Sequence, residues 1–402
     1  MNIFKKVFCR SYQAAFHLAL PVMPYREPKL FDAIEEVGEI ISTEQLTSVL
    51  LVTDKFLYEN GMTKRLETAL QECGVKCTVY ADTSPNPTVR NVAEAFRVYQ
   101  RSGCNGLIAF GGGSSIDCAK AVGARAAYPK RNLDQLKGML RVLRPIPPLI
   151  AIPTTAGTGS EVTVTAVITD SDTKHKYTMN NFTFIPPYAI LDPSVTYSLP
   201  QSLTATTGMD ALTHAVEAFI GRSTSKETRR LALEAVSLIF QNILTAYQEP
   251  TNTQARRNMM LASYKAGIAF SKSYVGYIHA VAHSLGGQYN IPHGLANSVL
   301  MPIVLEYYGS SAAGKLCILG RAAGVVSEND SPEIGAKKFI AAIRSLNKQM
   351  KIPEKLSGIK KEDIPKMAGH AEREANPLYP VPMLMDAKQL QIFYVKVADW
   401  SK

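Results

Sequence analysis

Short apolar runs alternate with helical patterns in the first half of the chain, and this alternation restricts the folds that the chain can adopt. Strands are predicted at residues 47–52, 76–80, 106–110 and 148–152. Between the second and third of these strands, the pattern of residues 89–100 indicates a helix. Strands that alternate with helices are typical of a parallel, doubly wound sheet, so an α/β domain is predicted here.

The second half of the chain changes character near Leu199 and Pro200, after which helical patterns follow one another. Over residues 226–247, for example, apolar side chains recur at about the 3.6-residue period of a helix. We therefore predict an α/β domain over residues 1–195 and an all-helical domain over residues 196–402.

The composition excludes several classes of protein. Of the 402 residues, 46% are hydrophobic and 19% are charged, which is ordinary for a globular protein with a core. The formal net charge is +10, but the Lys and Arg residues are scattered, whereas a nucleic-acid surface needs a clustered basic patch. A basic balance favours anionic small ligands instead, and a dinucleotide is one. No window of 18 apolar residues occurs, so no membrane span is predicted.

Six cysteines are spread thinly along the chain, at positions 9, 73, 77, 104, 118 and 317. They form no CxxC pair, and neither a nearby histidine nor a second pair completes a zinc site. Cysteines in such an arrangement are expected to be reduced core residues, which indicates a cytoplasmic protein.

Residues 1–25 form an N-terminal extension. Lys5, Lys6 and Arg10 precede an apolar stretch at residues 14–23, which superficially suits a targeting peptide. A histidine and a proline interrupt that stretch, and no small-residue cleavage site follows it. We therefore predict a short helix on the protein surface; docking to a membrane surface or to a partner is the alternative.

Two loops that follow buried strands have the composition of phosphate-binding loops. Residues 111–115 read Gly-Gly-Gly-Ser-Ser and open a predicted helix, whose N-terminus offers N–H groups and a positive dipole. Residues 153–161 are rich in hydroxyl groups and small side chains. The glycine run differs from the G-x-G-x-x-G pattern, so a tight turn is the alternative for that loop. Asp54 follows an earlier strand and either accepts from ribose hydroxyls, which favours NAD over NADP, or caps a helix.

The helical half carries a second pattern of chemistry-bearing residues. Asp210 and His214 are four residues apart and share one face of a predicted helix. His279 and His283 repeat this spacing on another helix, and His293 opens the next segment. One oxygen donor and several nitrogen donors suit a divalent ion such as Fe²⁺ or Zn²⁺. Histidines that serve only as core or surface residues are the alternative, because spacing does not show that the helices converge.

Four motifs in order give the chain its resemblance to a known family. They span residues 111–120 (GGGSSIDCAK), 153–161 (PTTAGTGSE), 208–219 (GMDALTHAVEAF) and 279–297 (HAVAHSLGGQYNIPHGLAN). With these motifs the chain resembles the iron-dependent (group III) alcohol dehydrogenase family from about residue 25 to the C-terminus. The resemblance implies a Rossmann-like parallel-sheet domain followed by an all-helical metal-binding domain, the architecture of dehydroquinate synthase.

The resemblance also implies roles for individual residues. Asp210, His214, His279 and His293 match the metal ligands of the family, and His283 matches a histidine near the nicotinamide that we interpret as a proton relay. Asp54 matches the position where an acidic residue accompanies NAD. The other residues expected to contact the cofactor are Asn86, Gly112, Gly113, Ser114, Asp117, Thr154, Thr155, Thr158, Thr163, Val167 and Lys176.

The function implied is that of a metal-dependent, NAD-linked alcohol dehydrogenase or aldehyde reductase. Hydride would pass between a metal-bound primary alcohol or small diol and nicotinamide, with Fe²⁺ as the ion, Zn²⁺ as its alternative, and NADP(H) disfavoured. The family resemblance further implies a homodimer or larger homo-oligomer. The motifs do not identify the alcohol or aldehyde.

Two other functions compete with this hypothesis. A dehydroquinate-synthase-like lyase would need a cluster of Lys and Arg beside the metal to hold a phosphate-bearing substrate, and only Lys272 lies near the metal motif in sequence. A catalytically vestigial assembly or docking protein would use the N-terminal extension, but it would have no need of an intact set of ligands. Stoichiometric metal and oxidation of NADH by a short aldehyde distinguish an enzyme from such a protein.

Overall fold

The structure of the chain is a computed structural model that describes residues 1–19, 23–170 and 176–401. The chain divides into two compact units. One unit is Pro24–Leu199, and the other combines Met1–Met23 with Pro200–Lys402.

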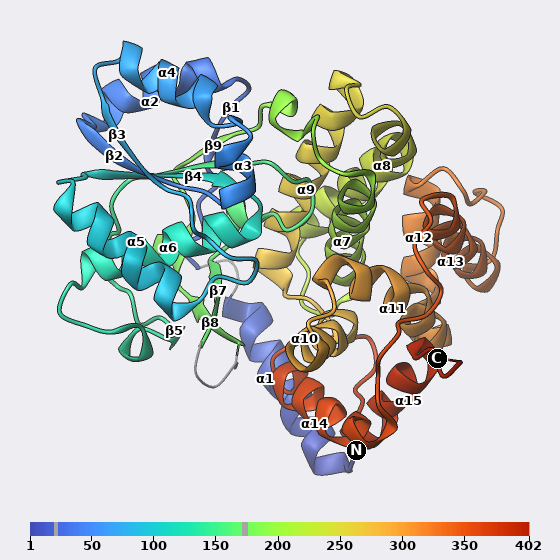
Figure 1. The fold of residues 1–402 in the computed structure, drawn as a ribbon. Coiled ribbons are helices and arrows are strands. Elements are labelled where there is room, and N and C mark those ends of the chain that lie inside the picture. Colours follow the sequence, from blue (N-terminus) through green and yellow to red (C-terminus); the bar gives the residue numbers. More distant parts are fainter. Residues whose placement is uncertain (20–22, 171–175, 402) are drawn as a thin grey trace. The chain divides into compact units, whose positions relative to one another are not determined.

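A six-stranded, all-parallel sheet forms the centre of the first unit, with the strand order β1-β9-β6-β4-β2-β3 (Figure 1). In chain order the strands are β1 (Lys29–Phe31), β2 (Ser48–Val52), β3 (Lys76–Tyr80), β4 (Gly106–Gly111), β6 (Leu149–Pro153) and β9 (Tyr188–Ile190). Every residue of β2, β4 and β6 is buried, as expected of parallel strands covered on both faces. The predicted doubly wound parallel sheet is confirmed.

Helices cover both faces of this sheet, because successive side chains of each strand point to opposite sides. Val49 and Leu51 pack in one core cluster with α2 (Val37–Glu44) and α4 (Lys64–Glu72). Leu50 and Val52 pack in the other cluster, with helices of the opposite face (Figure 1). Those helices are α5 (Val89–Arg101) and α6 (Gly113–Ala127), and the short helix α3 (Lys55–Glu59) follows β2.

A small three-stranded sheet was not predicted from the sequence. Its order is β5-β8-β7, with β5 (Gly138–Met139), β7 (Thr165–Thr169) and β8 (Lys176–Asn180). β7 and β8 pair antiparallel, with Val167 opposite Thr178. The remaining elements of this unit are the 3₁₀ helices η2 (Ile34–Glu36), η3 (Leu133–Gln135), η4 (Ser160–Val162), η5 (Phe182–Phe184) and η6 (Pro193–Thr196).

The second unit consists of helices, and α7 (Gln201–Ile220) lies at its centre. Every residue from Gly208 to Ile220 is buried, because α8, α9 and α11 all pack against α7. A helix enclosed in this way places the polar side chains of its middle turns inside the protein. The other helices are α1 (Ile3–Ala19), α8 (Lys226–Gln248), α9 (Thr253–Ser273), α10 (Tyr277–Tyr289), α11 (His293–Tyr308), α12 (Ala313–Ala322), α13 (Pro332–Gln349), α14 (Ile364–Ala375), α15 (Ala387–Val397) and the 3₁₀ helices η7 (Gly309–Ser311) and η8 (Lys361–Asp363).

The N-terminal extension differs from the sequence prediction in one respect. It contains the expected helix, α1, but this helix packs with the helical unit, whereas the sequence predicts residues 1–25 as part of the α/β domain. The reason is a set of specific contacts: the Gln13 side chain donates to the carbonyl oxygens of Pro377 and Tyr379. Proximity in sequence to the α/β domain therefore does not decide where the helix packs.

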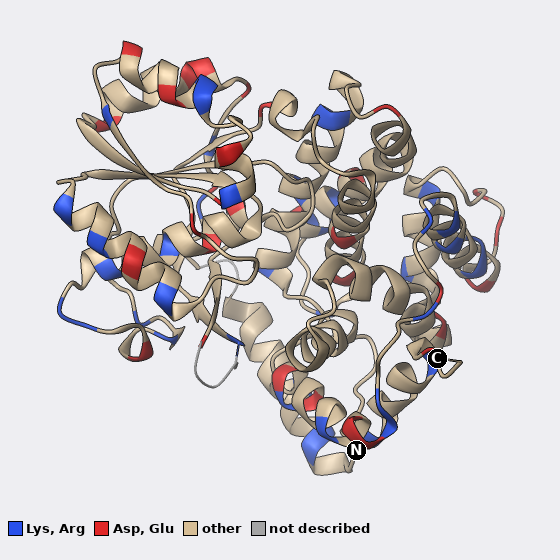
Figure 2. Cartoon of the chain, viewed as in Figure 1, with Lys and Arg blue, Asp and Glu red and all other residues tan. Residues whose placement is uncertain are grey.

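Charge is distributed as the sequence suggested. Basic and acidic residues are interspersed along the helices of each unit (Figure 2). Within the part of the chain that the structure describes, no helix combines the length and the apolarity needed to cross a membrane.

The turn at the end of β4 gives a first testable prediction. Gly111 has a φ of +151°, and a Cβ at this position would lie 2.4 Å from Ser115 Oγ. Gly111→Ala should therefore lower the free energy of unfolding by roughly 1–3 kcal/mol, from backbone strain and overpacking together. A Cβ at Gly112 would meet Thr155 only at 3.4 Å, so Gly112→Ala is the matched control. Equal melting temperatures for the two variants would contradict this account.

Candidate metal centre and nucleotide loops

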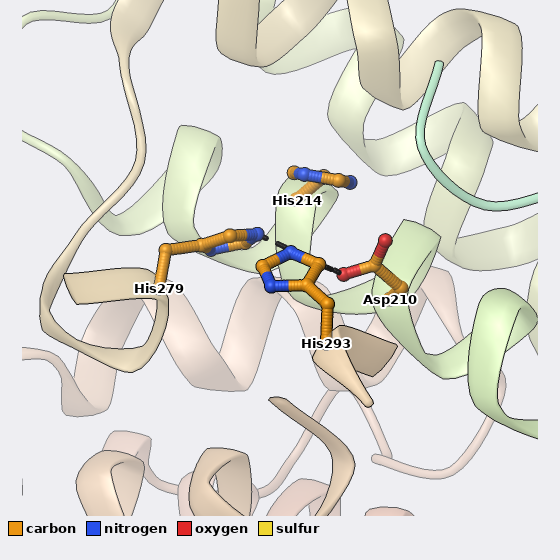
Figure 3. Close-up of side chains that lie close together, drawn as sticks. All are labelled: Asp210, His214, His279 and His293. Carbon is orange, nitrogen blue, oxygen red and sulfur yellow. Dashed lines mark ion pairs between the residues drawn. The ribbon is translucent and has the colours of Figure 1, made fainter. Parts of the chain in front are cut away.

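Asp210, His214, His279 and His293 come together in the helical unit (Figure 3). Each offers one donor atom, and these atoms all lie within 4.8 Å of one another. Asp210 Oδ1 lies 3.4 Å from His293 Nε2 and 3.8 Å from His279 Nε2. Asp210 and His214 come from consecutive turns of α7, His279 from α10, and His293 from the first residue of α11. The four side chains therefore converge, which their spacing in the sequence alone could not show.

Neighbouring side chains fix the orientation of this cluster. Asn297, one turn after His293 and completely buried, donates its amide to Asp210 Oδ1 at 2.7 Å. The His214 ring stacks on Phe270 of α9, with the ring centroids 4.1 Å apart. The donor atoms thus face one another because packed helices hold them.

Glu217 is a buried carboxylate that acts on the cluster through His279. Its oxygens accept from the backbone N–H groups of Gly276 and Ile278 at 2.7 and 2.8 Å. Glu217 Oε2 also lies 2.6 Å from His279 Nδ1. Burial raises the pKa of Glu217 to about 7, and these N–H donors oppose the rise. A carboxylate in contact with Nδ1 favours the tautomer with the proton on that nitrogen, so the lone pair resides on Nε2, which faces Asp210.

The donor set fits a divalent cation. Burial, followed by the neighbouring histidines, lowers the pKa of His279 well below its usual value, so the imidazole is neutral and can donate a lone pair. Among the described residues, the buried Nε2 of His279 has no hydrogen-bond partner. A buried polar atom without a partner is costly, and coordination to a metal would satisfy it. One carboxylate and three imidazoles suit Fe²⁺ or Zn²⁺.

His283 lies beside the cluster, one turn after His279 on α10. Its ring stacks on that of His293, with the centroids 5.0 Å apart. His283 Nδ1 is 2.7 Å from Glu374 Oε1 of α14.

The two predicted phosphate loops leave neighbouring strands of the α/β unit at the same edge of the sheet. β4 and β6 are parallel, with Gly111 opposite Pro153, and Thr154 N donates to Gly111 O at 3.0 Å. The second loop approaches the glycine turn closely, because a Cβ at Gly113 would lie 3.0 Å from the Thr158 side chain. Gly112 is the N-cap of α6, so the helix N-terminus opens at the loops.

Asn86 and Lys176 lie near the glycine turn as well, although they are distant from it in sequence. Asn86 N donates to Ser114 Oγ at 3.2 Å, and Lys176 Nζ donates to Asn86 Oδ1 at 2.8 Å. Burial lowers the pKa of Lys176. Hydrogen bonds between the polar residues Ser114, Asn86 and Lys176 therefore connect the N-terminus of α6 to β8.

Asp117 and Thr163 occupy a different environment from the loop residues. Asp117 accepts from Ser160 Oγ at 2.6 Å and from Val167 N at 2.9 Å, so both of its oxygens connect α6 to other parts of the unit. Thr163 Oγ1 lies 2.9 Å from the ammonium group of Lys120. The structure gives Asp117 and Thr163 contacts that shape the second loop.

Asp54 follows β2, the strand next to β4. Its Oδ1 accepts from Leu57 N at 3.0 Å and caps α3, so the helix-cap interpretation is confirmed. A cap uses one carboxylate oxygen, and the ribose role stays a prediction.

Three candidates were missed from the sequence: Lys120, Glu217 and Glu374. Five oxygens of residues 160–165 lie within 3.3 Å of the Lys120 ammonium, and burial lowers its pKa to about 8. A lysine between apolar residues of a buried helix was the available signal. Glu217 follows His214 by three residues and so shares its helix face. Glu374 gives no local signal.

Comparison with known proteins agrees with this arrangement. The model of the iron-containing alcohol dehydrogenase family matches residues 30–193, and that of the C-terminal part of the Fe-containing alcohol dehydrogenase family matches residues 204–396. The chain is 39% identical to a 1,3-propanediol dehydrogenase of Klebsiella pneumoniae, over 86% of this chain and 90% of that protein. It is 35% identical to an NAD-dependent methanol dehydrogenase of Bacillus methanolicus, over 84% and 89% respectively.

A solved structure extends the likeness to the fold. The crystal structure of a 1,3-propanediol oxidoreductase superposes with a TM-score of 0.89 at 36% identity, over 93% of this chain and 99% of that one. These relatives are metal-dependent alcohol dehydrogenases, and the protein is an oxidoreductase of the same class. The chain belongs to the iron-containing alcohol dehydrogenase family.

A substitution at Glu217 tests whether this carboxylate orients His279 for metal binding. Glu217→Gln should weaken binding of Fe²⁺ or Zn²⁺ by about 10–100-fold, because the amide no longer fixes the His279 tautomer. Titration against a competing chelator measures this change. Glu227→Gln, which changes a glutamate whose side chain is 47% exposed, is the control and should bind metal normally. Equal affinities of the two variants would show that Glu217 does not orient the ligand.

Proposed function

We propose that the protein is an NAD-linked alcohol dehydrogenase or aldehyde reductase in which Asp210, His214, His279 and His293 hold one Fe²⁺ ion, with Zn²⁺ as the alternative. The observation that carries the proposal is the convergence of these four donors around the buried His279 Nε2. Primary alcohols, small diols and the corresponding aldehydes are the proposed substrates, by analogy with the propanediol and methanol dehydrogenases to which the chain is similar.

The overall reaction converts an alcohol and NAD⁺ into an aldehyde, NADH and a proton. A divalent cation at the four donors would supply a Lewis acid, which lowers the pKa of a bound hydroxyl group. Asp210 and the three histidines would keep the cation in one place. His283 is the proposed proton relay: because Nδ1 contacts Glu374, Nε2 carries the lone pair that accepts the alcohol proton. A nicotinamide bound by the α/β unit would accept the hydride from the alcohol carbon.

The α/β unit is the proposed site of NAD. The glycine turn at Gly112 and Gly113 lets backbone approach a pyrophosphate, and the N-terminus of α6 favours its charge. Side chains around this turn supply hydroxyl, amide and ammonium groups. They belong to Asn86, Ser114, Thr154, Thr155, Thr158 and Lys176. We propose that Asp117, Thr163 and Val167 contribute by shaping the second loop.

The competing functions are less well supported. A lyase of the dehydroquinate-synthase type needs a cationic cluster beside the metal, but Lys272, the candidate from the sequence, pairs with Glu227 at 3.0 Å. A vestigial docking protein would not need Glu217 and Asn297 to orient the ligands. The six cysteines are free thiols, which supports the proposed cytoplasmic location. A homodimer or larger homo-oligomer is the proposed assembly, as the family resemblance implies.

His279→Ala tests the function directly. The variant should lose both metal and turnover while it retains NADH binding, because the cofactor residues lie in the other unit. Turnover is measured with a panel of C2–C5 alcohols and aldehydes on anaerobically iron-loaded protein, with NAD(H) and NADP(H). His17→Ala, an exposed histidine of α1, is the control. Alcohol oxidation by metal-depleted His279→Ala would refute the assignment.

Asp54 tests the cofactor preference separately from stability. Asp54→Asn keeps a side chain that caps helices well but removes the charge that repels a 2′-phosphate. It should raise kcat/KM for NADP relative to NAD by roughly tenfold, or about 1.4 kcal/mol, with little change in melting temperature. Asp54→Ala should shift the preference equally and also lose about 1 kcal/mol of stability with the cap. An unchanged preference in both variants would leave Asp54 as a cap alone.

A further inference from the structure

We propose that Glu374 positions the His283 imidazole, and that the N-terminal helix α1 holds the segment on which this contact depends. The inference rests on the proposed function, because it gives His283 its place in the reaction. It assigns the N-terminal extension an internal role in the helical unit.

Hydrogen-bond contacts connect three side chains, those of His283, Glu374 and Tyr379. Glu374 Oε1 lies 2.7 Å from His283 Nδ1 and accepts from the Tyr379 hydroxyl at 2.8 Å. Tyr379 is buried, and burial raises the pKa of its phenol well above the usual value, so the hydroxyl remains a donor. One carboxylate oxygen therefore accepts from two groups, which fixes its direction. The histidine side chain is 40% exposed and the glutamate 34%, so burial alone does not fix the rotamer of either.

Tyr379 belongs to residues 376–384, the segment that follows α14. The backbone N–H of Tyr379 donates to Ala375 O at 2.7 Å, and Arg222 N donates to Pro380 O, also at 2.7 Å. Asn376, at the start of the segment, accepts from the Tyr277 hydroxyl of α10 at 2.9 Å. The segment is thus attached to the helix that carries His283, and a shift of the segment would move Tyr379 relative to Glu374.

Helix α1 provides the remaining support of this segment. Gln13 is 3% exposed, and its amide donates to Tyr379 O at 2.7 Å and to Pro377 O at 3.1 Å. Arg10 donates to Val381 O and Pro382 O at 2.8 and 3.0 Å, and also to Gln13 Oε1. Two polar side chains of α1 therefore satisfy four carbonyl groups of one segment. A carbonyl group that is buried without a hydrogen-bond partner destabilises the folded state.

An aromatic row connects α1 to the same tyrosine. The rings of Phe16 and Tyr274 have centroids 4.8 Å apart, and those of Tyr274 and Tyr379 are 6.1 Å apart. Both distances fall in the range of favourable aromatic pairs. The backbone and the ring of Tyr379 are thus both held through α1, and Tyr379 in turn holds Glu374.

The position of the His283 proton tests the proposal independently of turnover. The zinc-loaded, 402-residue protein is labelled with ¹⁵N-histidine, and a long-range ¹H–¹⁵N spectrum reports the tautomer, with His283→Asn used for assignment. The wild type should show the proton on Nδ1. Glu374→Gln should populate both tautomers, because an amide either donates or accepts, and Gln13→Leu should shift the same signal by a smaller amount. Glu362→Gln, an exposed glutamate outside the contact, is the control.

Either a proton on Nε2 in the wild type or an unaltered His283 signal in Glu374→Gln would overturn the proposal. Kinetic measurements distinguish a failure of this proposal from a failure of the proposed function. In an active enzyme, Glu374→Gln should lower kcat by about tenfold to a hundredfold. The KM for the alcohol, the metal content and the melting temperature should be nearly unchanged. Tyr379→Phe should have a smaller effect of the same kind. A wild type without alcohol dehydrogenase activity would refute the proposed function, while the spectrum would still decide the role of Glu374.

Discussion

The contact between Glu217 and His279 is the interaction on which the metal centre depends. Both side chains are buried, so it is costly to leave their polar atoms without partners. Glu217 accepts from His279 Nδ1 and from two backbone N–H groups at the start of α10, and it thereby joins α7 to α10. The approach requires glycine at position 276, where a Cβ would lie 2.6 Å from Glu217 Oε1. The outcome is a helical unit whose centre presents nitrogen and oxygen donors to one point.

In the α/β unit, strand pairing and a buried lysine hold the two loops in place. Parallel pairing of β4 with β6 brings two loops to the same edge of the sheet, and the buried ammonium group of Lys120 holds the second loop against α6. A buried charge is tolerated because carbonyl and hydroxyl oxygens surround it. In both units, a buried ionisable group holds together residues that are far apart in the sequence.

The sequence was informative where one local period determines the structure. The strands β2, β3, β4 and β6 were predicted because they are short runs of β-branched and other apolar residues, and the pairing of Asp210 with His214 follows from the helical period. The strands β7 and β8 were missed because their side chains are partly exposed and give no continuous apolar run. Glu217 and Glu374 could not be assigned roles, because their importance comes from Gly276 and Tyr379, which adjoin them only in the fold. For the same reason the unit to which α1 belongs was not readable from its own residues.

The proposed function requires that one divalent cation binds to all four of Asp210, His214, His279 and His293. The most direct test is a crystal structure of the anaerobically iron-loaded protein, with anomalous diffraction measured on both sides of the iron absorption edge. We expect one anomalous peak, with one carboxylate oxygen and three imidazole nitrogens within about 2.0–2.2 Å, taking zinc-type bond lengths as the guide. Iron bound elsewhere, or a peak that omits His279, would contradict it.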